Sequence, residues 1–177
     1  MKFRYLTAAT VLLSFLLVCP RSIAVDTKGF IKSDAQILKS MKGVSVGVSD
    51  ISVEAKKEGL STLHIQTNVE LRLRQAGIKV FEMTERKDII NRSHLSVNIT
   101  CVKQGEEPVY AFSVNVELGD TVTLHRDPQV VVFYATTWKR EEVGIVGSIK
   151  LVDSIRNIVD HITDAFLNDY LKANPKK

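Results

Sequence analysis

The chain has 177 residues, of which 45% are apolar, and its 24 Lys and Arg exceed its 20 Asp and Glu by only four. These values are typical of one compact domain and exclude a disordered chain, because the apolar fraction is ordinary and the net charge is small. Nine glycines, four prolines and two cysteines are too few for a collagen-like chain or a disulfide framework.

The first 24 residues have the composition of an export signal. Lys2 and Arg4 precede an apolar run, residues 6–18, which is too short to span a bilayer comfortably. Ser22 and Ala24 place small side chains at the spacing that a signal peptidase recognises. We therefore predict a signal peptide over residues 1–24, cleaved after Ala24, and a bacterial protein that is periplasmic or secreted.

Lipidation at Cys19 is the alternative, although Val18 stands where a lipobox has a small residue. Cleavage after Ala24 removes Cys19 and three basic residues, leaving 21 Lys and Arg against 20 Asp and Glu. The mature chain is thus nearly neutral, which gives no support for a nucleic-acid partner. Its longest apolar run, residues 130–135, is too short for a transmembrane segment.

Residues 25–43 are predicted to form a flexible lead and a short helix. Ser33 and Gln36 have the spacing of a capping box, so the helix begins there and continues to about Lys42. Gly43 ends it.

A strand, a helix and a second strand follow, beginning the α/β domain predicted over residues 44–171. Apolar residues alternate over 44–48, and a change of parity predicts a bulge near residues 49–50 and a continued strand through Ile51 and Val53. Residues 59–76 carry apolar side chains at helical spacing, Gly77 caps that helix, and a strand begins at Ile78. This order implies a crossover that joins two parallel strands.

Three further strands are predicted over residues 95–101, 110–118 and 130–138, and a continuation of the second through Val122 and Leu124, after a break at Gly119-Asp120, is left open. The first two alternate apolar and polar side chains, whereas the third is apolar on both faces. Turns at residues 105–108 and 126–128 separate the strands, and residues 139–142 form a charged connection to the next element. Because two of the three strands have one polar face, most of the sheet has one side open to water.

The longest helix is predicted over residues 148–171. Its apolar stripe consists of Ile149, Val152, Ile155, Val159, Ile162 and Phe166. Residues 172–177 form a basic tail after the helix. The elements predict an α/β fold of the α+β type: a two-layer sandwich in which two long helices cover one face of a mixed sheet of about five strands.

The residues offer no catalytic, cofactor-binding or metal-binding constellation. His64, His94, His125 and His161 do not stand at the spacings of zinc sites, and Cys101 shares the parity of core residues. Nucleophile-elbow and phosphate-loop motifs are absent from the sequence. Residues 144–147 offer the nearest approach to an anion-binding helix start, although glycines there more often relieve close packing.

Tyr134 and Trp138 are the candidate partner-binding residues. Both share one parity of the strand over residues 130–138 and combine an apolar body with a polar group, which suits a partly wet surface. The alternative is that this strand is central and covered on both faces.

The junction Leu73-Arg74-Gln75-Ala76-Gly77-Ile78-Lys79-Val80, followed by the meander and the closing helix, resembles small periplasmic α/β envelope domains such as the amino-terminal domain of TolB. The resemblance covers about residues 44–171 and rests on the order of elements. It implies binding of proteins or lipopolysaccharide components and no enzymatic activity.

These observations lead to the hypothesis of an exported, non-enzymatic binding or accessory module for a protein or lipid component of the envelope. A carrier for an apolar small molecule or lipid, held between sheet and helices, is one alternative. A hydrolase-like enzyme that uses His94 or His125 with a nearby acid is another.

Overall fold

The computed structural model describes residues 34–82 and 92–175, all within one compact unit. The predicted signal peptide, its cleavage after Ala24 and the alternative at Cys19 lie outside the described residues. The elements in chain order are α1 (Asp34–Ile37), β1 (Val44–Val48), α2 (Val53–Lys57), α3 (Thr62–Gln75), β2 (Val80–Phe81), β3 (Ser93–Lys103), β4 (Val109–Leu124), β5 (Asp127–Gly147) and α4 (Ser148–Ala173).

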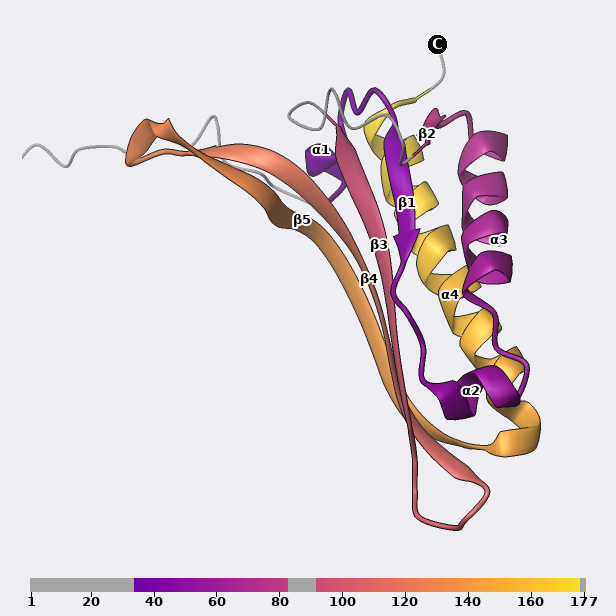
Figure 1. The fold of residues 1–177 in the computed structure, drawn as a ribbon. Coiled ribbons are helices and arrows are strands. Elements are labelled where there is room, and N and C mark those ends of the chain that lie inside the picture. The colour runs from indigo at the N-terminus through magenta and orange to yellow at the C-terminus, as the bar shows by residue number, and fades with distance from the viewer. Residues whose placement is uncertain (1–33, 83–91, 176–177) are drawn as a thin grey trace, which may run out of the picture. The chain divides into compact units, whose positions relative to one another are not determined.

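The strands form one mixed sheet in the order β2-β1-β3-β4-β5. β1 pairs in parallel with both β2 and β3, whereas β3, β4 and β5 are antiparallel neighbours. The two long helices, α3 and α4, lie side by side on one face of this sheet (Figure 1). The predicted two-layer sandwich, including the parallel crossover between its first two strands, is confirmed.

The core lies between the sheet and the two long helices. Every second residue of β3 and β4 points into this core. The helices contribute residues three or four positions apart, which lie on one helix face. Fully or almost fully buried members include Leu95, Val97, Ile99, Val114, Val116, Leu118, Ile65, Val69, Leu73, Ile155, Val159, Ile162 and Phe166. Cys101 is buried in the same core, as its parity predicts.

The segment before β1 is held by the far end of the chain. α1 has four residues and is shorter than the helix predicted to reach Lys42. Asn174, at the end of α4, accepts a hydrogen bond from the Ser40 amide at 2.9 Å and donates one to the Leu38 carbonyl at 2.9 Å. Gly43 then brings the backbone against β2, because a Cβ at this position would lie 2.6 Å from the Lys79 carbonyl oxygen.

The predicted bulge near residues 49–50 and the continued strand through Val53 are wrong. β1 ends at Val48, and residues 53–57 form α2. Ser52 begins this helix by accepting a hydrogen bond from the Ala55 amide at 3.2 Å, which makes Ser52 an N-cap. Ala55 is buried and Val53 is exposed, whereas a strand would place both side chains on the same face.

α3 agrees with its prediction. Ser61 caps its start by accepting from the His64 amide, and Ile65, Val69 and Leu73 face the core. Gly77 follows the helix with φ +87, a left-handed conformation that other residues adopt only at a cost. The strand predicted to begin at Ile78 is reduced to the two residues of β2.

The final hairpin is longer than the sequence predicts. β5 has 21 residues and includes the charged stretch 139–142, which is therefore not a connection. These residues pair with β4, from Lys139 opposite Glu117 to Glu142 opposite Val114. A strand at the sheet edge tolerates charged side chains. Residues 139–142 do not alternate apolar and polar side chains, so the sequence pattern does not identify them as a strand.

α4 carries the predicted stripe with one correction. Ile149, in the first turn, is 96% exposed, and Leu151 is the buried residue at that end of the helix. None of the helices within residues 34–82 and 92–175 combines the length and apolar character needed to cross a membrane.

Candidate functional site

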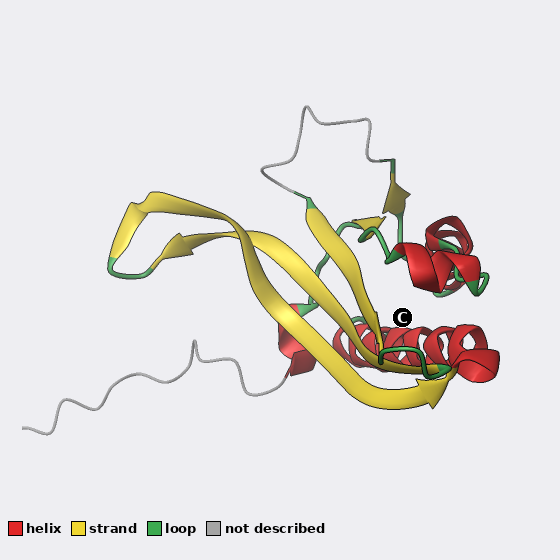
Figure 2. Cartoon of the chain, turned by 60° about the horizontal axis from the view of Figure 1, so that its bottom comes forward, coloured by secondary structure: helices red, strands yellow, loops and turns green. Residues whose placement is uncertain are grey.

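β4 and β5 extend beyond the rest of the sheet as a two-stranded arm, residues 120–135. The pairing of β3 with β4 ends at His94 opposite Gly119, whereas β4 continues to pair with β5 as far as Leu124 opposite Asp127. Figures 1 and 2 show this hairpin curving away from the helices. None of the helices in residues 34–82 and 92–175 therefore covers the arm as α3 and α4 cover the remainder of the sheet.

The arm exposes large apolar side chains on β5. Phe133 is 58% exposed and Tyr134 is 49% exposed, and Val130 and Val131 are also exposed. Residues 128–138 contain no charged side chain. Exposed apolar groups that gather on one element indicate a contact surface, because scattered single residues are the usual case on a free surface.

The structure separates the two predicted partner-binding residues. Trp138 pairs with Leu118, but the next pair toward the tip is Gly119 with Thr136, so Thr137 is an extra residue on β5. This bulge reverses the parity of the next residues toward the tip, as far as the second register shift between Asp120 and Val122. Tyr134 consequently lies on the open face of the sheet, and Trp138 lies on the helix face.

Trp138 is 3% exposed, which corrects the expectation that it forms an outward surface with Tyr134. Its ring meets Phe166 edge to face at 5.1 Å between centroids. Its indole Nε1 donates a hydrogen bond to Asp169 Oδ2 at 3.2 Å. Trp138 therefore joins the arm's base to α4, and only Tyr134 remains available to a partner.

Tyr134 sits where the arm leaves the sheet, in a backbone conformation that is costly for its residue type. Its φ is +67, and a register shift of the β4–β5 ladder lies opposite, between Asp120 and Val122. The ring lies against Gly119, where a Cβ would be 3.0 Å from two ring carbons, and 5.5 Å from the His94 ring. Its hydroxyl hydrogen-bonds with Ser96 Oγ on β3.

Hydrogen bonds around Asp120 hold the base of the arm. Its carboxylate accepts from the Ser93 hydroxyl through Oδ1 and from the Thr137 hydroxyl through Oδ2, each at 2.5 Å. Burial raises the pKa of Tyr134, so the phenol stays neutral at physiological pH. The base of the arm is thus fixed, while its apolar residues remain uncovered.

The histidines do not come together. His94 hydrogen-bonds through Nδ1 to Ser45 Oγ at 2.8 Å, and burial lowers its pKa. His125 lies in the tight turn at the tip of the arm, and His161 contacts Glu142 through Nδ1 at 2.8 Å. Within the described part of the chain, no group of three or more His, Cys, Asp and Glu side chains forms a metal site.

Burial raises the pKa of the Cys101 thiol, which keeps it protonated. Gly144 lies close to the Phe112 ring, since a Cβ there would be 2.7 Å from a ring carbon. The burial of Cys101 agrees with its interpretation as a core residue, and among residues 144–147 the close packing is at Gly144 within β5 rather than at the helix start.

Sequence reasoning missed the arm itself, although a signal for it exists. The alternation of β4 continues through Val122 and Leu124, and the facing strand is apolar on both parities without a charge. Two such strands joined by a two-residue turn predict a hairpin that runs past the neighbouring strand.

Comparisons with known proteins identify no family. No family model matches the chain, and no curated protein matches it. Among solved structures, a PelC dodecamer from Paraburkholderia phytofirmans is similar, with a TM-score of 0.43, 15% sequence identity, and coverage of 75% of this chain and 90% of that chain. A similarity at this level carries no argument about what this chain does.

Proposed function

We propose that this chain is an exported, non-enzymatic binding module of the periplasm whose arm engages a protein of the cell envelope. The partner contributes an extended apolar segment that adds to the free edge of β5. The observation that carries the proposal is the uncovered apolar surface of residues 130–134 on a two-stranded arm.

An isolated two-stranded ribbon is marginally stable in water. Covering one exposed large apolar side chain contributes up to about 1.5–3 kcal/mol, so Phe133 and Tyr134 together are a substantial reserve of binding free energy. Aromatic residues that keep a polar group and a large apolar body are also the commonest anchors of protein interfaces.

The free edge of β5 supports strand addition at the arm and opposes it over residues 139–142. β5 is the last strand of the sheet, and β4 is its only strand partner among the described residues. Over residues 139–142 the strand carries Lys, Arg and Glu side chains, which discourage pairing with another strand. Residues 129–136 lack charge and lie on the arm, so this portion of the edge is suited to a partner strand.

Photocrosslinking in living cells tests the proposal. A photoreactive phenylalanine analogue at position 131 or 133 is expected to capture a discrete envelope protein in the periplasmic fraction. The matched control is position 143, because Val143 is 72% exposed on the same strand but lies outside the arm. Capture from position 143 without capture from 131 or 133 contradicts the role of the arm.

The variant Phe133→Asp should abolish capture from position 131, and Val143→Asp should leave it unchanged. If the only protein captured is a second copy of this chain, the arm mediates self-assembly, and the proposal of an envelope partner is overturned. Sequencing of the amino terminus in the periplasmic fraction tests export, with Val25 expected as the first residue.

A further inference from the structure

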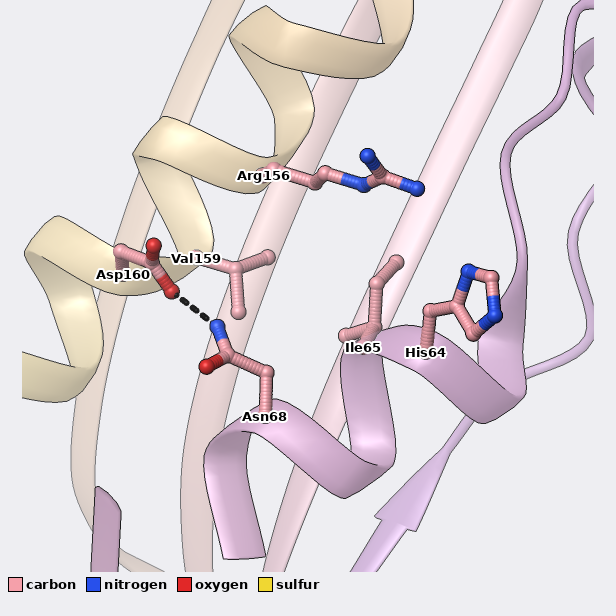
Figure 3. Close-up of a pocket in the computed structure, with 6 residues that line it drawn as sticks. All are labelled: His64, Ile65, Asn68, Arg156, Val159 and Asp160. Carbon is pink, nitrogen blue, oxygen red and sulfur yellow. Dashed lines mark hydrogen bonds between the residues drawn. The ribbon is translucent and has the colours of Figure 1, made fainter. Parts of the chain in front are cut away.

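A pocket of about 290 Å³ lies between the two long helices, on the side of the molecule away from the sheet's open face. Three residues of α3 and three of α4 line it: His64, Ile65, Asn68, Arg156, Val159 and Asp160 (Figure 3). Ile65 and Val159 are buried and form its apolar floor, while His64 and Arg156 are exposed at its mouth.

The Asn68 amide closes one end of the pocket by donating to Asp160 Oδ1 at 2.6 Å (Figure 3). Asp160 also lies 3.9 Å from the Arg72 guanidinium, which in turn hydrogen-bonds to Asp164. The carboxylates of Asp160 and Asp164 are therefore directed toward Asn68 and Arg72.

Arg156 is left without a carboxylate. Asp160 stands four residues later on the same helix, where it would ordinarily pair with Arg156, but its carboxylate is engaged by α3. Among the described residues, no acidic oxygen lies within 4.0 Å of the Arg156 guanidinium. Figure 3 shows this side chain reaching from α4 toward α3, with His64 on the opposite side of the opening.

We infer that this pocket binds a small organic anion, with an oxyanion group at the mouth and an apolar body on the floor. The Arg156 guanidinium is suited to a bidentate contact with a carboxylate or phosphate, and the His64 imidazole offers a second hydrogen-bonding group. A molecule with about ten non-hydrogen atoms fits the volume, which is at the small end of ligand pockets.

This site is independent of the proposed function, because it lies in the helix layer and contains no residue of the arm. It also differs from a carrier cavity between sheet and helices, since the apolar floor here is formed by two facing helices. The ligand class follows from Arg156, which has no carboxylate partner among the described residues, above the buried side chains of Ile65 and Val159.

Amide chemical-shift titrations of the full mature chain with benzoate and with phenyl phosphate test the inference. Saturable shifts are expected at residues 64–68 and 156–160, and the tighter of the two probes identifies the oxyanion. Benzamide keeps the ring without the charge and is expected to bind at least tenfold more weakly, since hydrogen bonds to charged groups are the stronger class.

Arg156→Gln should weaken binding of the better anion by about tenfold or more. Arg74→Gln is the matched control, because Arg74 also lies on these helices but pairs with Glu70 at 2.8 Å away from the pocket. Thermal melting of both variants establishes that they fold. The inference is overturned if benzamide binds as tightly as benzoate, or if Arg156→Gln binds the anion as tightly as wild type. It is also overturned if no shifts occur at residues 64–68 and 156–160.

Discussion

Tyr134 and Trp138 stand four residues apart on β5, yet they lie on opposite faces of the sheet. Thr137 accounts for this, because it is the extra residue between the pair Leu118–Trp138 and the pair Gly119–Thr136. The same bulge anchors the indole in the core and leaves the phenol at the base of the arm.

The burial of Trp138 predicts its fluorescence. The chain has one tryptophan, so its emission reports this position alone. We expect a blue-shifted emission and weak quenching by iodide in the native protein, both changing to solvent-exposed values in denaturant. Native emission identical to that of the denatured chain would contradict the placement of the indole against Phe166.

Substitution within the stripe of α4 should destroy the fold. Ile162 is buried, and Ile162→Asp places an unpaired carboxylate in the core at a cost of about 3–5 kcal/mol or more, comparable with the whole stability of a domain. We expect insoluble protein or the absence of a cooperative melt. Ile149→Asp is the matched control on the same helix, and its melting temperature should stay within a few degrees of wild type because Ile149 is 96% exposed.

Asn174 should hold the segment around α1 in place. Asn174→Ala removes the acceptor for the Ser40 amide and the donor to the Leu38 carbonyl, with an expected loss of about 1–2 kcal/mol for two hydrogen bonds. Hydrogen exchange should accelerate at Ser40 and remain unchanged at β3 amides. Uniform acceleration throughout the domain would instead indicate global destabilisation.

Stability should fall at alkaline pH through Tyr110. Burial raises the pKa of this phenol, and the Glu58 carboxylate that accepts its hydrogen bond at 3.1 Å raises it further. Between the unfolded pKa near 10 and the higher folded pKa, the native state binds more protons than the unfolded state, so stability declines as pH rises.

Denaturant melts above pH 10 should therefore show a smaller decline in Tyr110→Phe than in wild type. Glu58→Gln should also reduce the decline, because it keeps an acceptor but removes the charge. A decline of the same steepness in all three proteins would exclude Tyr110 as its origin.

Several elements are determined by local sequence. The stripe of α3, its cap at Ser61 and its end at Gly77 depend on spacing and backbone preference within one segment. The alternation over β3 and the first part of β4 likewise identifies the buried face before any partner strand is known. The layer architecture follows from these faces, because each apolar stripe requires a covering element.

The tertiary structure alone decided the features at the candidate site. Whether Lys139 to Glu142 forms a strand depends on β4 lying beside it, and the side on which Tyr134 emerges depends on one unpaired residue, Thr137, within the ladder. Likewise, the Asp160 carboxylate contacts the neighbouring helix, and no carboxylate of the described residues pairs with Arg156. Periodicity describes one element at a time, whereas register, bulges and the choice among ion-pair partners are properties of two elements in contact.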